Sequence, residues 1–470
     1  KSRLCLQKQS LPRKVSIGSS WLRLRLTLCR KVAMSSALAV GHLCLNYNQG
    51  DFLKYNNKLH TVLAVTAVFL CVSVFSGCSL LDELGLSDNS QISQTVTSGG
   101  TVVGARSNAY SGYGFSNLER EDLQNLYEML DQYANKSSVE KIVADGTFSV
   151  KEISQALEAY KNDNPQVFWL DDTFEYSHFG SKTGIILSFI YDGDELSQMK
   201  QNFDAKVSEI IANAPTNSTD YDVELYINDY IVDNCQYDKE GAAAADNGET
   251  LGNEHNAYGA LIDQKAVCDG YSAAFQLLCN KLGIECVSIQ GTSKDEPHMW
   301  NGVKINNEWY HTDVTWNDSD EYVHSERYFY LNLTTEQIKA DHTINLSYSE
   351  VSDDDFDENT IYNIFVPSCT SQTYNYFNAS CPKLTNINGS DEIVTLLAQT
   401  AAQWGEDFDV VIDDGLDFQT TVDSLASDGY IYNWLEKANA KNGNNPKISD
   451  KSKLYNFSEH RLLTIKLQYD

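Results

Sequence analysis

Three side chains that could together perform nucleophilic chemistry occur between Val267 and Trp316. They are Cys268, His298 and Asp313, in that order along the chain. A thiolate is a strong nucleophile, an imidazole can take up and return a proton, and a carboxylate can orient that imidazole. These three residues are therefore the candidate catalytic residues, provided that the fold brings them together.

Cys268 lies just before a segment with the pattern of a buried helix. Apolar residues recur at helical spacing over residues 271–282, and Gly283 follows where a left-handed helix stop is expected. The first turn of such a helix has unpaired N–H groups and the positive end of the helix dipole, which favour a thiolate and could stabilise an oxyanion. By contrast, Cys279 and Cys286 are expected to be buried structural side chains.

Three strands are predicted downstream, over residues 284–289, 298–305 and 308–316. The polar pair Asn306–Asn307 between the last two favours a two-residue β-hairpin turn. The chain is therefore expected to combine a helix that carries the cysteine with an antiparallel sheet that carries the histidine and the aspartate.

The register of this hairpin decides whether the histidine and the aspartate can meet. A pairing of Ile305 with Glu308 sets the register. In that register His298 lies opposite Thr315, and Asp313 is its diagonal neighbour on the same face. The carboxylate could then orient the imidazole while the other ring nitrogen faces the thiol. A change of one residue in loop length would place the two side chains on opposite faces.

The motifs around these residues resemble those of the transglutaminase-like superfamily, whose members have a papain-like cysteine site. The resemblance covers residues 223–345 and rests on Ala257–Leu261, Val267–Ser272, Leu282–Ile284, His298–Asn301, Trp309–Trp316, Tyr328–Leu331 and Asp341–His342. It implies that Cys268 is the nucleophile, His298 the general base and acid, and Asp313 the orienting carboxylate. Where relatives carry a His-Asp pair on an upstream helix, this chain has Asn228–Asp229.

The fold class expected from these features is α+β, with a papain/transglutaminase-like core and accessory α/β regions on both sides of it. We expect residues 1–57 to be a non-native leader or mispredicted start, with a genuine transit segment or cytoplasmic tail as the alternative. A signal peptide is expected over residues 58–78 and a flexible tether over 79–115. The folded part is expected to comprise an N-terminal accessory region (116–215), the transglutaminase-like catalytic domain (216–345) and a C-terminal α/β accessory region (346–470).

The N-terminal part of the chain resembles a bacterial lipoprotein signal. Residues 59–81 contain no charged side chain, follow Lys54 and Lys58, and include the segment Phe75–Cys78. Small residues allow a signal peptidase to cut, and the sulfur of Cys78 would receive the lipid. A plain transmembrane helix is the alternative, since the apolar stretch is close to the length that spans a bilayer. The expected location is extracytoplasmic, with a lipid anchor to a bacterial membrane at Cys78.

The charge balance excludes one large class of partners. Residues 1–78 hold 11 basic side chains and one acidic one, so the remaining chain has 24 basic and 64 acidic side chains and a formal charge of −40. Such a surface repels nucleic acid and anionic lipid. We therefore expect no nucleic-acid partner, and membrane contact only through the lipid anchor.

The other histidines and cysteines do not predict a metal centre. Four more histidines lie in this part of the chain: His255, His311, His324 and His342. They lack the paired spacing that a zinc site needs, so neither a metal nor another cofactor is expected. His311 is expected to be solvent-exposed, with a role beside His298 and Asp313 as the alternative. Cys369 and Cys381 are close enough in sequence to form a disulfide that closes a loop.

The function expected from these features is thiol-based acyl transfer. The Cys268 thiolate would attack an amide carbonyl of a protein or peptide, and His298 would protonate the departing amine. Water or an amine would then resolve the thioester, so hydrolysis and transfer both stay open. A substrate associated with the cell wall fits the expected location. Two alternatives are a catalytically silent binding module and a scaffold protein that works through its C-terminal region.

Overall fold

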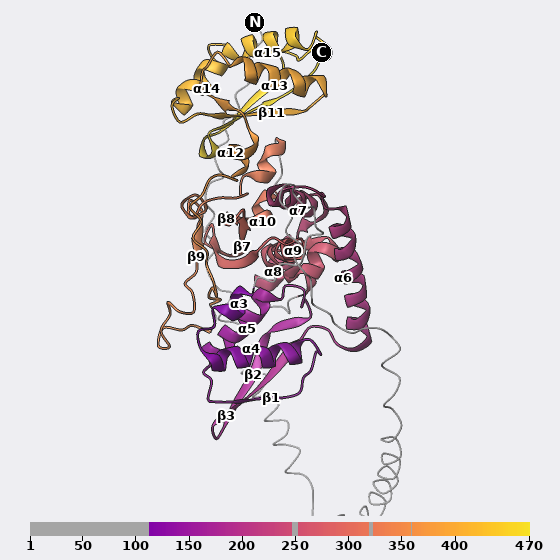
Figure 1. The fold of residues 1–470 in the computed structure, drawn as a ribbon, viewed down its shortest axis with the longest axis vertical. Coiled ribbons are helices and arrows are strands. Elements are labelled where there is room, and N and C mark those ends of the chain that lie inside the picture. Colours follow the sequence, from indigo (N-terminus) through magenta and orange to yellow (C-terminus); the bar gives the residue numbers. More distant parts are fainter. Residues whose placement is uncertain (1–111, 247–251, 319–322, 359) are drawn as a thin grey trace, which may run out of the picture. The chain divides into compact units, whose positions relative to one another are not determined.

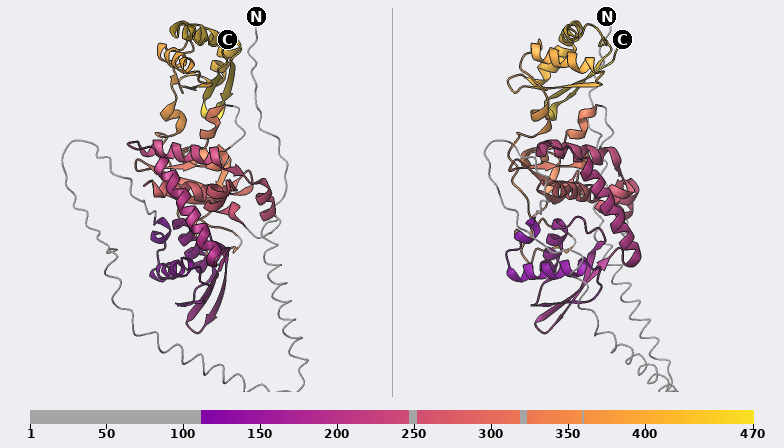
Figure 2. Two further views of the ribbon diagram at one scale, coloured as in Figure 1. Left: turned by 90° about the vertical axis from the view of Figure 1, so that its right-hand side faces the viewer. Right: turned by 45° about the vertical axis from the view of Figure 1, so that its right-hand side comes forward.

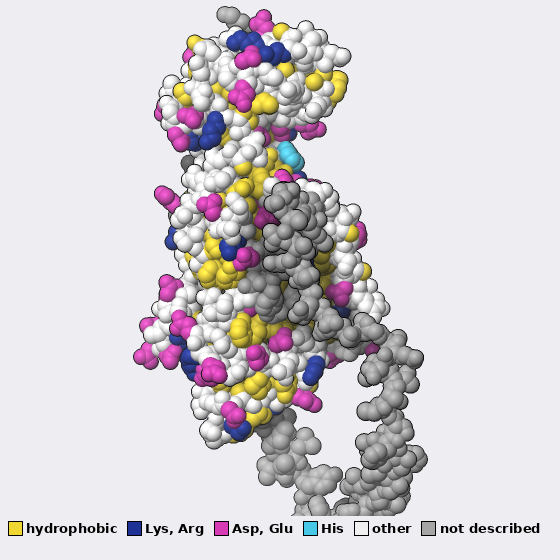
Figure 3. All heavy atoms as spheres, viewed as in Figure 1, with side chains coloured by type: hydrophobic (Ala, Val, Ile, Leu, Met, Phe, Trp, Pro, Cys, Tyr) yellow, Lys and Arg dark blue, Asp and Glu magenta, His cyan; other side chains and the backbone are white. Residues whose placement is uncertain are grey.

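The computed structural model describes residues 112–246, 252–318, 323–358 and 360–470 (Figure 1). The predicted leader, the signal peptide with Cys78 and nearly all of the tether lie outside the described residues. Among the described residues, no helix combines the length and the apolar character needed to cross a membrane. On the face shown in Figure 3, acidic side chains are spread widely with fewer basic ones among them, which agrees with the formal charge of −30.

The N-terminal region forms a small α/β module. Its elements are α3 (Tyr113–Ser116), α4 (Glu121–Ala134), β1 (Ile142–Asp145), α5 (Val150–Asp163), β2 (Leu170–Phe179) and β3 (Lys182–Phe189). The three antiparallel strands have the order β1-β3-β2, and the helices pack on one face of this sheet (Figure 1). Leu126 and Leu130 of α4, Leu157 of α5 and Ile185 of β3 share its apolar core.

The central region contains the candidate catalytic residues. Its first half comprises α6 (Gly193–Asn213), α7 (Asp220–Asn234), β4 (Gln236–Tyr237), α8 (Lys239–Asp246), η1 (Asn253–His255), η2 (Gly259–Asp263), β5 (Lys265–Ala266) and α9 (Cys268–Lys281). Its second half comprises β6 (Cys286–Ser293), β7 (Glu296–Ile305), β8 (Glu308–Thr312), α10 (Val314–Asn317), η3 (His324–Tyr328), α11 (Thr335–Ile338) and β9 (His342–Ile344). The antiparallel sheet has the order β8-β7-β6-β9.

A helix packed on this sheet forms the core of the region, as the α+β prediction requires. Phe275 and Leu278 of α9 share one buried apolar cluster with Val303 of β7 and Tyr310 of β8. Phe203 of α6 belongs to the same cluster. The buried face of α6 therefore packs on the central region. The predicted domain boundaries stay a prediction.

The C-terminal region is a separate α/β module with its own core. Its elements are α12 (Tyr376–Ser380), β10 (Lys383–Leu384), α13 (Asp391–Ala402), β11 (Asp407–Ile412), α14 (Phe418–Ala426), α15 (Tyr430–Lys441), β12 (Lys453–Phe457), η4 (Ser458–His460) and β13 (Leu462–Lys466). The sheet order is β10-β11-β13-β12, with only β10 and β11 parallel. Figure 2 shows the longer helices gathered on one face of this sheet.

The elements that were predicted to carry the cysteine and the histidine are confirmed. Helix α9 begins at Cys268, and Gly283 has the expected left-handed conformation, with φ 83°. Asn306 and Asn307 both have positive φ, 49° and 66°, as a type I′ hairpin turn requires. The hairpin has the predicted register, since Ile305 pairs with Glu308.

The third predicted strand is shorter than expected. Strand β8 ends at Thr312, and residues 314–317 form the short helix α10 instead of continuing the strand to Trp316. The carboxylate of Asp313 causes this break because it accepts a hydrogen bond from the backbone N–H of Trp316 at 3.1 Å, as a helix N-cap does. The prediction that Thr315 lies opposite His298 in the ladder is therefore wrong.

The predicted disulfide is also absent. All six cysteines that the structure describes are free thiols. Cys369 is buried with its backbone N–H donating to Thr335 Oγ1. Cys381 instead follows α12 and packs with Phe377 and Val411 at the C-terminal module. The two thiols belong to different packing environments, which explains why proximity in sequence does not pair them.

Candidate active site

Cys268 lies at the N-terminal end of a well-anchored helix. It is the first residue of α9 and is partly exposed, whereas the following helix face is buried in the core. The backbone N–H of Val267, the N-cap residue, donates to the carbonyl of Glu254 at 2.8 Å, and its carbonyl accepts from Tyr271 N–H at 3.0 Å. The thiol is thus held at the helix end where N–H groups lack acceptors within the helix.

His298 lies on β7 and is paired with Asp313 at the end of β8. Its Nε2 is 2.6 Å from Asp313 Oδ2, and the two side chains are 8% and 0% exposed. The Cys268 thiol lies close enough to this ring to help raise the pKa of His298, and the Nδ1 nitrogen of the ring does not face Asp313. The structure therefore brings together all three residues predicted from the sequence. Their catalytic role stays a prediction.

The electrostatics of this group favour a charged imidazole. Burial opposes charge on the His298 ring, but the Asp313 carboxylate and the Cys268 thiol outweigh that effect and raise the pKa of His298 to about 10. Burial also opposes ionisation of Asp313, yet the adjacent imidazoles lower its pKa to about 2. At neutral pH the arrangement is thus an imidazolium beside a carboxylate, a partner suited to a thiolate.

A second imidazole, not predicted as a site residue, contacts the same carboxylate. His342 begins β9 and is fully buried, with Nε2 3.0 Å from Asp313 Oδ2 and Nδ1 2.6 Å from Asp341 Oδ1. Strand β9 reaches this position by pairing with β6, where His342 lies opposite Ser293. One usable signal was the Asp341–His342 pair, which is among the motifs that resemble the superfamily, but no local pattern connects this pair to Asp313.

His311 is buried, so the expectation of solvent exposure is wrong. Its Nδ1 accepts a hydrogen bond from Trp300 Nε1 at 3.1 Å, and its Nε2 lies 3.1 Å from Thr335 Oγ1. Burial, with the charges of His342 and Lys339, lowers the pKa of His311 to about 3, so the ring is neutral. The Trp300 ring also stacks beside His298, with centroids 6.1 Å apart, so His311 contacts a residue that packs against the candidate site.

Helix α7 fixes the end of β8 next to Asp313. The fully buried Glu224 accepts hydrogen bonds from Thr312 Oγ1 at 3.1 Å and from Asn332 Nδ2 at 2.6 Å. Burial raises the pKa of Glu224 to about 8. One turn further, Asn228 Oδ1 accepts from Asn317 Nδ2 of α10 at 2.8 Å. Asn228 therefore supports the segment around Asp313 without entering the candidate site.

One cluster in the described part of the chain has a composition suited to a metal ion. Ligand atoms of His298, Asp313 and His342 lie within 4.8 Å of one another. Their hydrogen bonds account for this closeness, because Asp313 Oδ2 faces both imidazoles and Oδ1 accepts from Trp316. We therefore interpret the cluster as a hydrogen-bonded group and not as a metal site. The expectation that the chain binds no metal or cofactor stays a prediction.

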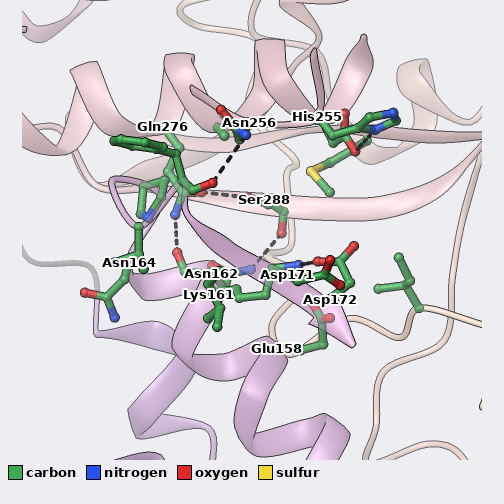
Figure 4. Close-up of a pocket in the computed structure, with 18 of the residues that line it drawn as sticks. Glu158, Lys161, Asn162, Asn164, Asp171, Asp172, His255, Asn256, Gln276 and Ser288 are labelled. Carbon is green, nitrogen blue, oxygen red and sulfur yellow. Dashed lines mark hydrogen bonds and ion pairs between the residues drawn. The ribbon is translucent and has the colours of Figure 1, made fainter. Parts of the chain in front are cut away.

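A cavity of about 130 Å³, lined by both apolar and charged side chains, lies between the N-terminal module and the central region (Figure 4). The end of α5 and the start of β2 form one wall, and α9 with β6 forms the other. Gln276 connects the two walls by donating to the carbonyl of Asn162 at 2.6 Å, and Lys161 pairs with Asp172. Asp269, next to Cys268, also lines the cavity and pairs with His255 at 2.8 Å.

Comparison with known proteins agrees with this fold. Residues 206–314 match the family model of the transglutaminase-like superfamily. Kyphoscoliosis peptidase from mouse is 34% identical over 68 residues, and the human protein is 32% identical over the same length. Each alignment covers 12% of this chain and 10% of the relative, so the chain matches only about a tenth of the length of these curated relatives.

Two solved structures are similar to this chain in part. A crystal structure of a TGase has a TM-score of 0.22 and 17% sequence identity, covering 44% of this chain and 60% of the other. A candidate cysteine protease from Cytophaga hutchinsonii has a TM-score of 0.20 and 14% identity, covering 30% and 61%. The residues that match the family model include α9, β7 and β8, the elements that carry or precede the candidate catalytic residues. Residues 206–314 therefore form a domain of the transglutaminase-like superfamily.

Proposed function

We propose that this domain is a thiol enzyme that hydrolyses or transfers amide acyl groups of a protein or peptide substrate. The observation that carries the proposal is the contact of His298 with both Asp313 and Cys268 at the start of α9. A cysteine, a histidine and an aspartate, each common alone, are thus arranged as nucleophilic catalysis requires: the histidine lies between the thiol and the carboxylate.

The proposed reaction begins with the thiolate–imidazolium pair. The Cys268 sulfur attacks the amide carbonyl carbon, and the carbonyl π electrons move to oxygen, where N–H groups of the first turn of α9 can stabilise the charge. His298 then gives its proton to the amine nitrogen, the C–N bond breaks and a thioester remains. Water or an amine attacks the thioester, His298 takes up the proton, and the thiolate is released. Water gives hydrolysis, and an amine gives transfer.

The cavity beside α9 supports a proposal for where part of the substrate lies. Four carboxylates line it, from Glu158, Asp171, Asp172 and Asp269, against the two basic side chains Lys161 and His255. Such a lining favours amide or cationic groups over anionic ones. The acidic surface opposes nucleic-acid binding for the same electrostatic reason.

The alkylation rate of Cys268 tests the proposed chemistry. In the full chain, peptide-resolved mass spectrometry is expected to show fast labelling of Cys268 at pH 6, because the imidazolium of His298 persists up to a pH of about 10 and stabilises the thiolate. His298→Ala should slow this labelling. The buried Cys279 provides an internal control and should stay unlabelled in the folded protein. If Cys268 is labelled only above pH 8 and the rate is the same in His298→Ala, the enzyme proposal is wrong. The alternative, a catalytically silent binding module, then becomes the better interpretation.

We also propose an extracytoplasmic location with a lipid anchor at Cys78, supported by the sequence of residues 54–81. In a bacterial host the full chain is expected to incorporate a labelled fatty acid and to fractionate with membranes. Cys78→Ala should lose the label, because the sulfur that accepts the lipid is gone. Cys71→Ala, which changes a cysteine within the same apolar stretch, is the matched control and should keep the label. Unchanged labelling of Cys78→Ala contradicts the anchor.

A further inference from the structure

His342 is a buried imidazole that the proposed reaction does not use, and both of its nitrogens face carboxylates. Nε2 lies 3.0 Å from Asp313 Oδ2, and Nδ1 lies 2.6 Å from Asp341 Oδ1. An ionised carboxylate only accepts hydrogen bonds, and a neutral imidazole has a single N–H. Both contacts are hydrogen bonds only if the ring carries both protons. The geometry therefore describes a buried imidazolium between two carboxylates.

Resting on the proposed function, we propose that His342 is a positioning residue. As an imidazolium held by Asp341, it fixes the Asp313 carboxylate toward His298 and balances part of its charge. The Asp313 carboxylate held in this orientation keeps a proton on His298 beside Cys268, and the positive charge of His342 weakens that hold enough for His298 to release the proton to a leaving group. Beside the Cys268 thiol, the two imidazole rings and the two carboxylates then form one hydrogen-bonded row.

The surroundings of His342 hold the ring in this orientation. The Trp300 ring lies edge-on to it with centroids 5.0 Å apart, and the Tyr330 ring lies 5.7 Å away. The Tyr330 hydroxyl donates to the second oxygen of Asp341 at 2.6 Å, which orients that carboxylate. The His342 side chain has no exposed surface. A ring enclosed in this way cannot turn without losing both carboxylate contacts.

Charged and titratable groups reach His342 from each element packed around it. His298 of β7 has its ring centroid 5.3 Å away, Asp313 follows β8, and Asp341 precedes β9. His311 of β8 is neutral, and the ammonium of Lys294 lies over the nearby Trp316 ring at 3.3 Å. Burial opposes charge on His342, but the hydrogen bonds to Asp313 and Asp341 outweigh it and raise its pKa. The two adjacent carboxylates thus match the two imidazolium charges.

The test compares the pH dependence of Cys268 alkylation in the full chain and in His342→Gln. Glutamine keeps a hydrogen-bonding side chain but removes the positive charge, so the thiolate is less stabilised at low pH. The expected result is labelling about tenfold slower at pH 6, with a rate close to that of the unmodified chain at pH 9. His324→Gln, which changes an exposed histidine outside this group, is the matched control and should leave the profile unchanged.

Two results overturn the role of His342. The first is a loss of the same size at every pH, which marks a structural effect, and the second is an unchanged profile. The proposed function is tested separately by the pH dependence of Cys268 alkylation in the unmodified chain, because that measurement alone shows whether Cys268 is activated.

A second measurement is independent of thiol reactivity and of the folding of His342→Gln. In Cys268→Ala with ¹⁵N-labelled histidine, the ring of His342 is expected to show two bound protons at pH 7 by NMR. Cys268→Ala keeps every contact of His342 that the structure shows. A ring with a single proton would contradict the proposal, whatever the alkylation profiles show.

Discussion

Cys268→Ala is expected to abolish amide hydrolysis and acyl transfer while leaving the fold intact. Removal of the nucleophile of a triad costs on the order of 10⁶-fold in kcat, because no other group takes over the covalent step. Alanine is a good helix former, and Cys268 is a partly exposed first residue of α9, so stability should change little. Two assays measure the two fates of the thioester. Release of amine without incorporation reports hydrolysis, and incorporation of a fluorescent primary amine into a protein substrate reports acyl transfer.

A matched variant separates this effect from a general loss of thiols. Cys381 is also partly exposed but packs at the C-terminal module, away from the contacts of His298. Cys381→Ala should keep the activity within about twofold. If Cys268→Ala retains activity at the level of Cys381→Ala, the thiol mechanism is wrong, and a scaffold or binding role becomes the better interpretation.

The candidate site could be predicted where local sequence determines its geometry. The start of α9 follows from the apolar spacing and Gly283, and the register of the β7–β8 hairpin follows from two asparagines that readily adopt positive φ. In that register Asp313 comes directly after the last paired residue, Thr312, and can reach His298. These short-range constraints explain why three residues spread over 46 positions could be assigned together.

The rest of the site depends on contacts that are distant in sequence. His342 reaches Asp313 only because β9 pairs with β6, and such pairing leaves no periodic signal in a three-residue strand. The burial of His311 depends on Thr335 of α11, which lies 24 positions further on. The end of β8 was missed for a different reason. Asp313 is a good N-cap residue, but the apolar and aromatic residues after it also suit a strand.

Asp313→Asn is expected to reduce kcat by roughly 10⁴-fold, as replacement of the orienting carboxylate does in other triads. An amide can present its NH₂ group to His298, which favours the wrong tautomer, and it removes the negative charge that keeps the ring protonated. The imidazolium, which persists to a pH of about 10 beside Asp313, should then be lost near the ordinary histidine value of about 6.5. Labelling of Cys268 at pH 7.5 should therefore fall in Asp313→Asn.

The same change should alter how stability depends on pH. A folded-state pKa of about 10 for His298 lies above its unfolded value, so its contribution is complete below pH 6.5 and is lost as the pH rises to 10. Urea unfolding should show a decrease in the free energy of unfolding between pH 7 and pH 10 that is smaller in Asp313→Asn. Asp295→Asn, on the exposed β6–β7 turn, is the control and should keep the slope. Equal slopes in all three proteins would show that Asp313 does not hold the charge on His298.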